Sequence, residues 1–577
     1  MIRGSPRQQA ASQRLFARPG GEAVALLAGP RASKSARNRS ARGFSKPQRD
    51  GKRREGMILL VVLVTVAILS LAALTLGDLM LAEREGVKIS TQMAQARSLA
   101  LSGVEAARFF VSMDEQWQTD NGEWFNNPSW FAGMVVQESA DPRETGLFAI
   151  VAPDWSDYSA SAIRYGLENE SAKLNVNSLL LADKTVENGG RQLLMGLPGM
   201  TEDVADAILD WLDPDDEPRE FGAELEYYTT LPTPYTPKNG PLETIEELLL
   251  VRGVTPELLF GADRNRNGVI DAGETIPEVF ADLSADDPVA YRGWSAYLTL
   301  FSMELNVRPD GSPKIDINQS DLEKLYDEIE AEFGPELATF IVAYRQNGPY
   351  TGEEEGEPVP LDVELDFSRQ AKVKFDTVLD LIGAKVRVQF AGEEKPRVLD
   401  AVVPDDPVAL RAILPVIMAN LTATSSKVIP GRININLAPS SILYGIPNLD
   451  PGVADLILES RPLDPTYIDD DNYYYETWPL AEGLVTVEEM KALMPFVTCG
   501  GSVFKAQVVG YFAGGGPSCR VEAILDATVR PARLLFWRDM SHLGRGFQAE
   551  VLGTPSSSIQ GLLGPGTSEA GAAFPGS

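Results

Sequence analysis

The sequence contains almost no histidine and very little cysteine. One histidine, His542, and two cysteines occur among 577 residues. Histidine is the usual acid–base residue near neutral pH and a common zinc ligand, so its scarcity argues against histidine-based catalysis and histidine-bound zinc. Two cysteines are too few for a cysteine metal site. We therefore expect a protein that is not an enzyme; the alternative is a membrane-anchored hydrolase that works with carboxylates.

Basic residues are scarce beyond the N-terminal segment. Residues 1–56 contain 14 Lys and Arg against 3 Asp and Glu, a net charge of +11. The remaining residues contain 37 basic and 79 acidic side chains, a net charge of −42. A body this acidic repels the phosphates of nucleic acids. We interpret residues 1–56 as a separate basic leader and expect no nucleic-acid partner.

Charged residues are absent from Met57–Leu76, a run of 20 residues. As a helix rising 1.5 Å per residue, this run is about 30 Å long, which matches the hydrocarbon core of a bilayer. The basic flank before it and the acidic body after it predict a transmembrane helix over residues 57–76, with the N-terminus inside and the body outside. Small and apolar residues continue at steps of three and four to Val111, so we predict one long helix over residues 57–112.

Three short segments of the body repeat one pattern. They read KLNVN, KIDIN and RININ, at residues 173–177, 314–318 and 432–436. Each ends in Asn, which suits the start of a helix because its amide can cap the first turn. Helix-like segments follow each copy. We predict three helical repeats, over residues 173–254, 314–386 and 432–497.

The repeats are similar to helix-hairpin-helix or SAM-like modules, in which a turn such as LPG joins two helices. Such modules often bind DNA through the backbone amides of that turn. The turns here read PGMTED and PNLDPG, with acidic residues where a phosphate would lie. We expect these modules to serve packing and protein contacts.

Strand-like segments flank the repeats. LFAIVAPD and AIRYGLENE precede them, and VFKAQVVGYF and CRVEAILDATV follow them. We therefore predict an α+β fold, in which a small α/β body formed by residues 113–172 and 498–547 is interrupted by a helical insertion, residues 173–497. Residues 548–577 are rich in Gly, Ser, Pro and Ala and are predicted to be disordered.

The segment DRNRNGVIDAGE, residues 263–274, has the spacing of an EF-hand calcium loop. Its ligands would be the carbonyl of Val269 and the side chains of Asp263, Asn265, Asn267, Asp271 and Glu274. Gly268 stands where such a loop turns sharply. A ligand set made only of oxygen selects Ca²⁺, and its charge predicts a structural site with a dissociation constant of about 10⁻⁴–10⁻³ M. The alternative is an Asn- and Gly-rich turn without metal.

Cys499 and Cys519 lie on either side of the strand-like segment Val503–Phe512. In an oxidising compartment such a pair tends to form a disulfide. By closing the loop between the two cysteines, the bond would stabilise the fold by about 3 kcal/mol. We predict this disulfide; the alternative is two separate buried thiols.

The N-terminal arrangement resembles the class III signal of type IV pilins and pseudopilins: a basic stretch, Gly56, an apolar helix and an amphipathic extension. The resemblance implies that prepilin peptidase cleaves between Gly56 and Met57 and methylates the new amine of Met57. Most of these proteins have Glu at the fifth mature position, which is Val61 here. A missing Glu is a mark of the minor pseudopilin K of type II secretion systems, although the leader is much longer than that family's.

Residues 208–258 resemble the same family through the elements DW-D-D, GAE, YY, PKNGP and EEL. In that family a helical domain interrupts a pilin-like α/β body and binds calcium. The resemblance implies a second calcium site in this chain, with Asp213, Asp215 and Glu224 as its ligands. An acidic, solvated loop is the alternative.

The resemblance also implies a function. The chain would be a structural subunit that caps the tip of the type II secretion pseudopilus during protein export across the outer membrane. Its partners would be the minor pseudopilins of the I and J types, prepilin peptidase, and the secretin and exported proteins. It would be held in the inner membrane by one pass, with its N-terminus cytoplasmic and its body periplasmic. The alternative is a minor pilin of a type IV pilus or a DNA-uptake system.

Overall fold

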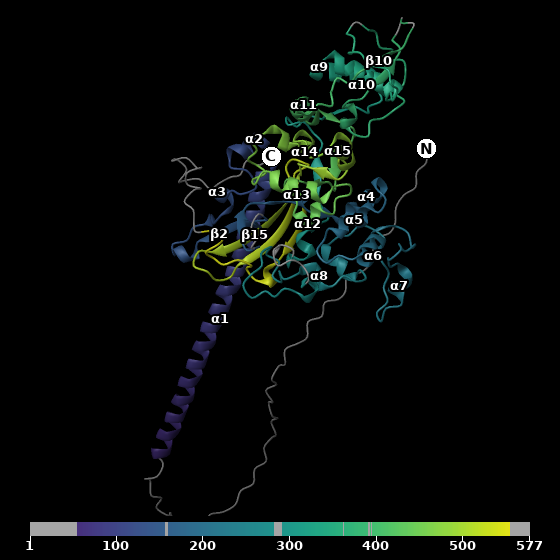
Figure 1. The fold of residues 1–577 in the computed structure, drawn as a ribbon. Helices are drawn as coiled ribbons and strands as arrows, with labels where there is room; N and C mark the ends of the chain where they lie inside the picture. The colour runs from purple at the N-terminus through teal and green to yellow at the C-terminus, as the bar shows by residue number, and fades with distance from the viewer. Residues whose placement is uncertain are drawn as a thin grey trace, which may run out of the picture. The chain divides into compact units, whose positions relative to one another are not determined.

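A computed structural model of the chain describes residues 55–155, 160–281, 291–361, 363–390, 393 and 395–553 (Figure 1). The predicted leader up to residue 54 and the predicted tail from residue 554 onward lie outside the described residues. The chain divides into two units, residues up to Leu81 and residues from Ala82 onward. The expected α+β class is confirmed, because one long apolar helix, a sheet and many short helices are present.

The first unit contains the N-terminal part of helix α1, which spans Glu55–Ser112. Its side chains from Met57 to Leu81 are exposed, and the helix is long and apolar enough to cross a membrane. A helix satisfies all its backbone hydrogen bonds internally, which a lipid environment requires. The prediction of one helix over residues 57–112 is confirmed.

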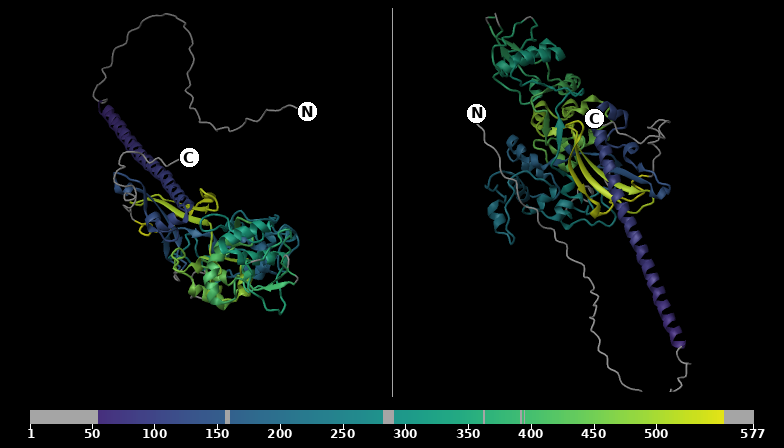
Figure 2. Two further views of the ribbon diagram at one scale, coloured as in Figure 1. Left: turned by 90° about the horizontal axis from the view of Figure 1, so that it is seen from above. Right: turned by 180° about the vertical axis from the view of Figure 1, so that it is seen from behind.

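In the second unit, the remaining part of α1 packs against a sheet, and both views of Figure 2 show the end of α1 lying against the yellow strands. The buried side chains of α1 recur every three or four residues and are Ala96, Leu99, Ala100, Val104, Ala107, Phe110 and Val111. Most of them are small, which allows a close approach to the sheet. A methyl group added at Gly103 would lie 2.8 Å from the ring of Phe148.

The sheet has the strand order β1–β2–β15–β16–β17, and every pair in it is antiparallel. Two short strands extend it, because β3 pairs with β2 and β4 pairs with β15. The strands are β1 (Met134–Gln137), β2 (Gly146–Pro153), β3 (Ile163–Tyr165), β4 (Glu168–Asn169), β15 (Val503–Phe512), β16 (Cys519–Asp526) and β17 (Arg533–Asp539). Two distant parts of the chain therefore complete one sheet, and Figure 1 shows β2 beside β15.

Short helices occur throughout the described chain between β4 and β15. Helices α2 (Glu115–Asp120) and α3 (Pro128–Phe131) precede the sheet, and the others are α4 (Leu179–Thr185), α5 (Gly189–Met195), α6 (Glu202–Leu212), α7 (Leu225–Thr229), α8 (Pro256–Phe260), α9 (Leu322–Phe333), α10 (Pro335–Asn347), α11 (Pro407–Asn420), α12 (Ser440–Leu443), α13 (Pro451–Ser460), α14 (Trp478–Ala481) and α15 (Val487–Leu493). Threonines start several of them. Thr486 forms a capping box with Glu489 at the start of α15, which satisfies backbone N–H groups at that end.

Each of the three sequence motifs forms the first strand of a two-stranded parallel sheet. The pairs are β5 (Leu174–Asn175) with β6 (Leu298–Thr299), β8 (Ile315–Asp316) with β11 (Leu421–Thr422), and β13 (Ile433–Asn434) with β14 (Val497–Thr498). Two further pairs are antiparallel: β7 (Met303–Leu305) with β12 (Val428–Pro430), and β9 (Val386–Val388) with β10 (Arg397–Leu399). The first two repeats therefore extend well beyond residues 254 and 386, where the sequence analysis placed their ends.

The last Asn of the first two motifs holds distant backbone together rather than capping a helix. The side chain of Asn177 both accepts from and donates to the backbone of Leu242, at 2.7 and 3.1 Å. Asn318 bonds to the backbone of Phe375 in the same way, at 2.8 and 2.9 Å. These amides connect the start of each of these two repeats to backbone about 60 residues further along the chain. The expected capping role was wrong for Asn177, because α4 begins after Ser178 without a side-chain cap. It is confirmed for Asn175 of the same motif, whose side chain accepts from the N–H of Asn177 at 3.1 Å and caps the 3-10 helix Val176–Ser178.

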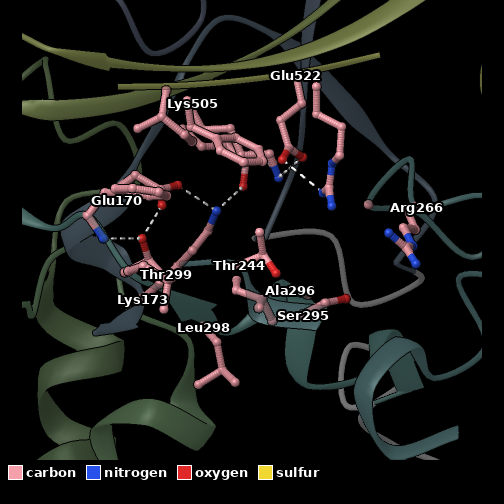
Figure 3. A pocket seen from close by; sticks show the side chains of 18 of the residues that line it. Glu170, Lys173, Thr244, Arg266, Ser295, Ala296, Leu298, Thr299, Lys505 and Glu522 are labelled. Atoms are coloured by element: carbon pink, nitrogen blue, oxygen red, sulfur yellow. Dashed lines mark hydrogen bonds and ion pairs between the residues drawn. The ribbon is translucent and has the colours of Figure 1, made fainter. Parts of the chain in front are cut away.

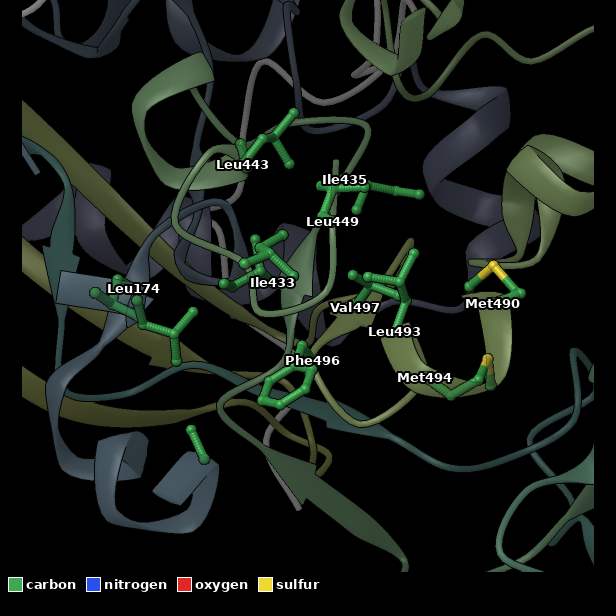
Figure 4. Packing of buried hydrophobic residues seen from close by; sticks show 14 of the residues in the cluster. Leu174, Ile433, Ile435, Leu443, Leu449, Met490, Leu493, Met494, Phe496 and Val497 are labelled. Carbon is green, nitrogen blue, oxygen red and sulfur yellow. The ribbon is translucent and has the colours of Figure 1, made fainter. Parts of the chain in front are cut away.

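One hydrophobic core runs through the inserted region. Figure 4 shows Leu174 of the first repeat near Ile433 and Phe496 of the third. The sheet has separate cores, one between α1 and the sheet and a smaller one on its other face. Each motif strand thus contributes to the central core, which fixes the positions of the polar residues beside it.

Candidate calcium sites and their surroundings

The predicted processing site lies within α1. The helix begins at Glu55, so Gly56 and Met57 are both helical. The side chains of Met57 and Val61 are exposed. Val61, at the position where most pilins have Glu, is therefore an apolar side chain on an apolar helix surface.

The predicted EF-hand loop follows α8 and is organised around Asp263. The carboxylate of Asp263 accepts hydrogen bonds from the backbone N–H groups of Asn267 (3.0 Å) and Gly268 (2.8 Å). Gly268 has a φ of +87°, which an L-residue rarely adopts, so glycine is required at this turn. The amide oxygen of Asn267 accepts from the N–H of Val269 at 2.9 Å. The loop thus makes the sharp turn that the motif predicts.

The remaining side chains of the loop meet at Asp271. Its carboxylate accepts from the side-chain amides of Asn265 (2.7 Å) and Asn267 (2.9 Å). The carboxylate of Glu274 accepts from the backbone N–H groups of Arg264 (2.9 Å) and Asp271 (3.0 Å). All five side chains expected as ligands therefore belong to one hydrogen-bonded cluster.

Two features of the loop fit a cation. The side-chain oxygen of Asn265 is buried without a hydrogen-bond partner, and buried polar atoms are normally satisfied. Burial, with Glu274 nearby, raises the pKa of Asp263 to about 6. Among the described residues no three His, Cys, Asp or Glu side chains are arranged to hold a metal ion. Binding would require the amides of Asn265 and Asn267 to rotate, which exchanges nitrogen for oxygen with little change of shape.

Side chains of the sheet hold this loop from outside. The guanidinium of Arg520 on β16 donates to the carbonyl of Asn265, and the amide of Gln507 on β15 donates to the carbonyl of Arg266 at 3.2 Å. The amide of Asn267 donates to the carbonyl of Gly546 at 2.6 Å. The loop is therefore built into the contact between the inserted region and the sheet, which the sequence did not indicate.

The second predicted site is an acidic cluster at the end of α6. Glu224 is only 3% exposed, and neither of its carboxylate oxygens has a hydrogen-bond partner. Burial, with Asp210 and Asp213 nearby, raises the pKa of Glu224 to about 8. Burial and the neighbouring Asp215 raise the pKa of Asp213 to about 6. A cation would neutralise these carboxylates, so the cluster fits a metal ion by its charge.

Asp210 also belongs to this acidic cluster, although it was not among the ligands expected from the sequence. Asp210 is fully buried on α6, three residues before Asp213 and therefore on the same side of the helix. The expected ligand Asp215 is exposed, and its carboxylate accepts the N–H of Glu217 at 2.9 Å. Arg219 lies beside the cluster, 3.5 Å from Asp210 and 3.6 Å from Asp213. The i, i+3 spacing of two acids on a predicted helix could have indicated Asp210.

A series of ion pairs, in which acidic and basic side chains alternate, lines a cavity of about 90 Å³ beside the EF-hand loop (Figure 3). The ion pairs, in order, are Glu170–Lys173 (2.8 Å), Lys173–Glu168 (3.3 Å), Glu168–Lys505 (3.1 Å), Lys505–Glu522 (3.7 Å), Glu522–Arg538 (3.0 Å), Arg538–Glu246 and Glu246–Arg266 (2.7 Å). The ion pairs connect the start of the first repeat, through strands β4, β15, β16 and β17 of the sheet, to the EF-hand loop. The carboxylates of Glu168, Glu522 and Glu246 each lie between two cations, which offsets the cost of burying their charge.

The predicted disulfide between Cys499 and Cys519 is absent, and both cysteines are free thiols. Cys519 pairs with Gly510, near the far end of β15, whereas Cys499 precedes the first residue of that strand. Seven residues of extended strand span about 23 Å, and a disulfide needs Cα atoms about 5–6 Å apart. The prediction was wrong because the strand between the cysteines holds them at its opposite ends.

Comparisons with known proteins find similarity in the first part of the inserted region. Residues 172–260 match the family model for the type II secretion system (T2SS) protein K. The chain is 33% identical over 104 residues to the type II secretion system protein K of Pectobacterium carotovorum subsp. carotovorum. That alignment covers 18% of this chain and 30% of the relative, so the chain spans about a third of the relative's length. The sequence resemblance to this family is confirmed.

A solved structure also matches the chain. The crystal structure of the GspK–GspI–GspJ complex from the type 2 secretion system of enterotoxigenic Escherichia coli covers 80% of this chain and 98% of the matched chain. The sequence identity is 13% and the TM-score is 0.33.

Proposed function

We propose that this chain, whose residues 172–260 are a domain of the type II secretion protein K family, is the minor pseudopilin that caps the tip of a type II secretion pseudopilus. The observation that supports this is the place of the domain in the fold. It begins three residues after β4, and β15, which pairs with β4, follows the whole helical region. A large helical insertion thus interrupts a sheet that packs on α1. Such a subunit fits the end of a filament better than a position between its layers.

We propose that α1 anchors the chain in the inner membrane before assembly, with its N-terminus in the cytoplasm and its body in the periplasm. Prepilin peptidase would cleave between Gly56 and Met57. The pseudopilins of the I and J types would pack along α1. The part of α1 after Leu81 offers them exposed apolar side chains at Val87, Ile89, Met93, Leu101 and Phe109. The secretin and exported proteins would meet the acidic inserted region.

We propose that calcium binds both acidic clusters as a structural ion. At residues 263–274 it would be held by the side chains of Asp263, Asn265, Asn267, Asp271 and Glu274 and the carbonyl of Val269. At the end of α6 it would be held by Asp210, Asp213 and Glu224. Helices α5 and α6, joined by the LPG turn, would serve as a helix-hairpin-helix module for packing. No catalytic role is needed for either ion.

The proposed processing is tested by the mass of the mature N-terminus in membranes of the native host. We expect a peptide that begins with N-methylated Met57. The Gly56→Val variant should retain the leader, while Gly77→Ala, a substitution in the same helix with open space around it, should be processed normally. An intact leader on the unmodified protein would contradict the assignment to the pseudopilin pathway.

The proposed role is tested by deleting the gene and measuring exported proteins in the medium. Secretion should stop and should return with the unmodified gene but not with the Gly56→Val variant. Site-specific crosslinkers at Leu101 and Phe109 should capture I- and J-type pseudopilins. Normal secretion by the deletion strain would contradict a role in the secretion machine.

A further inference from the structure

The three repeats place a basic residue and a threonine side by side in the same way. The basic residue directly precedes the first strand of each two-stranded sheet, and the threonine ends the second strand. The pairs are Lys173 with Thr299, Lys314 with Thr422, and Arg432 with Thr498. Because the strand registers are identical, the three positions can be compared residue by residue.

In the first repeat the side chain of Glu170 contacts both Lys173 and Thr299. The carboxylate of Glu170 forms an ion pair with Lys173 at 2.8 Å, and the hydroxyl of Thr299 donates to its other oxygen (Figure 3). Glu170 is 3% exposed. A second carboxylate, that of Glu168, lies 3.3 Å from the same ammonium.

The third repeat has the same arrangement. The carboxylate of Glu304 forms an ion pair with Arg432, and the hydroxyl of Thr498 donates to its other oxygen. Glu304 is also buried, and Glu476 pairs with Arg432 at 2.9 Å. In both outer repeats, therefore, the cation has two carboxylates, and one of them also holds the threonine.

The middle repeat has an asparagine where the outer repeats have glutamate. The side-chain amide of Asn306 donates to the hydroxyl of Thr422 at 2.9 Å, so it takes the place beside the threonine. The amide carries no charge, and no ion pair or hydrogen bond joins Lys314 to any residue that the structure describes. Lys314 is the one basic residue of the three without a carboxylate partner.

A cavity of about 250 Å³ lies at this position, and Asn306, Lys314 and Thr422 line it. It has room for several water molecules or a small organic acid. Burial lowers the pKa of Lys314, and Glu476 and Glu304, neither of which forms an ion pair with it, only partly oppose this effect. The other charged residues of the lining are Arg432, which is engaged by its two glutamates, Glu476, which pairs with Arg432, and Asp376, which is exposed.

We propose that this cavity binds a small carboxylate anion, which contacts Lys314 in the place of the glutamate that the middle repeat lacks. Short mono- and dicarboxylates such as acetate and succinate have the right charge and size. In the outer repeats a carboxylate lies between the cation and the threonine hydroxyl; in the middle repeat Asn306 occupies the side of the threonine, and the anion would take the side of Lys314. The proposal does not depend on the export role of the chain.

The test is the thermal unfolding of the full-length protein in detergent, titrated with sodium succinate and, separately, with sodium chloride at equal ionic strength. Ligand that binds only the folded state raises the unfolding temperature in a saturable way. We expect such a rise with succinate and not with chloride. Lys314→Gln should raise the succinate concentration needed for half-saturation by at least about tenfold, which corresponds to a loss of about 1.4 kcal/mol in binding free energy.

A second variant restores the missing acid. Asn306→Asp should abolish the response to succinate, because its own carboxylate places a negative charge beside Lys314. The variant also loses the hydrogen bonds that the amide donates to the carbonyls of Thr424 (3.4 Å) and Ser426 (3.0 Å), so the test is its response to succinate and not its unfolding temperature without anion. The control is Lys324→Gln on the exposed face of α9, where the lysine pairs only with Glu328; it should respond like the unmodified protein. Equal responses to succinate and chloride, or an unchanged succinate response in either cavity variant, would overturn the proposal.

Discussion

Gly510 of β15 lies directly against Ala100 of α1. A methyl group added at residue 510 would stand 2.5 Å from the backbone nitrogen of Ala100 and would also overlap the carbonyl oxygen of Ala96. Both neighbours are backbone atoms, which cannot move aside without moving the helix. The distance between α1 and the sheet is therefore set by the absence of a side chain at this position.

We predict that Gly510→Ala destabilises the body by about 1–3 kcal/mol, because overpacking a filled contact forces backbone shifts. Urea unfolding of the full-length protein in detergent measures the change. Gly86→Ala, in the part of α1 before its contact with the sheet and with nothing within 4 Å of the added methyl, is the control and should cause no loss. Equal stability of the two variants would mean that α1 does not depend on this contact.

Calcium removal should destabilise the body through the loop at residues 263–274. A ligand at 100 times its dissociation constant stabilises the folded state by about 2.7 kcal/mol. We predict that excess EGTA lowers the unfolding temperature and that added Ca²⁺ restores it, while Mg²⁺ does not. Glu274→Gln should reduce the calcium-dependent part of the shift.

Asp310→Asn provides the control for the loop variant. Asp310 is exposed in another turn, where it accepts the N–H of Ser312 at 2.8 Å. Its loss removes the same charge without touching either acidic cluster. An unfolding temperature that EGTA leaves unchanged would refute structural calcium in the unmodified protein.

Sequence patterns could predict those features that depend on neighbouring residues. The buried stripe of α1 follows helical spacing, and the turn at Gly268 follows the motif of its loop. The partner strands of the repeats could not be predicted in this way. Strand β6 has only two residues, and it pairs with β5 more than 100 residues earlier. A strand this short carries no alternation that identifies it, so the ends of the first two repeats were placed too early.

Features that depend on residues far apart in the sequence could not be predicted from it either. The residues of the charged cavity come from the first repeat, the EF-hand loop and strands β2, β4, β15, β16 and β17 of the sheet. No spacing rule connects them before the chain is folded. The cysteines are a different case, since the segment between them already read as an extended strand. The deciding fact is the pairing of Cys519 with Gly510 near the end of that strand, which holds the cysteines too far apart for a disulfide.

The second calcium site is tested by comparing Glu224→Gln with Asp215→Asn. Glu224 is buried without a hydrogen-bond partner, whereas Asp215 is exposed. We predict that Glu224→Gln reduces the calcium stoichiometry, measured by isothermal titration, by one ion. In EGTA at pH 7 the same variant should be more stable than the unmodified protein, because Glu224, with its pKa raised to about 8, must take up a proton on folding and glutamine does not.

Asp215→Asn should leave both properties unchanged. The two substitutions remove one carboxylate each, and their positions lie within one segment of ten residues. A difference between the two variants in calcium stoichiometry or stability is therefore caused by the burial of Glu224 and not by the change in net charge. Loss of one calcium ion in Asp215→Asn would instead support the ligand set expected from the sequence.

Glu168 links the folded state to pH. Burial raises the pKa of Glu168, but Lys173, Lys505 and Arg164 outweigh burial and lower it to about 2. The usual value in an unfolded chain is about 4.3. Because the folded pKa is the lower one, the stability from this carboxylate is complete above about pH 5 and is lost as the pH falls toward 2. The difference corresponds to roughly 3 kcal/mol.

We predict that the free energy of unfolding falls as the pH is lowered from about 5 to 3, and that Glu168→Gln removes part of this slope. At pH 7 the variant should be destabilised by about 3–5 kcal/mol, because Lys173 and Lys505 each lose one buried partner. Glu144→Gln, which removes an exposed partner of Lys88, should leave both values nearly unchanged. Urea titrations at constant ionic strength separate these outcomes. If Glu168→Gln had the full slope of the unmodified protein, the buried ion pairs of Glu168 would not couple its protonation to folding.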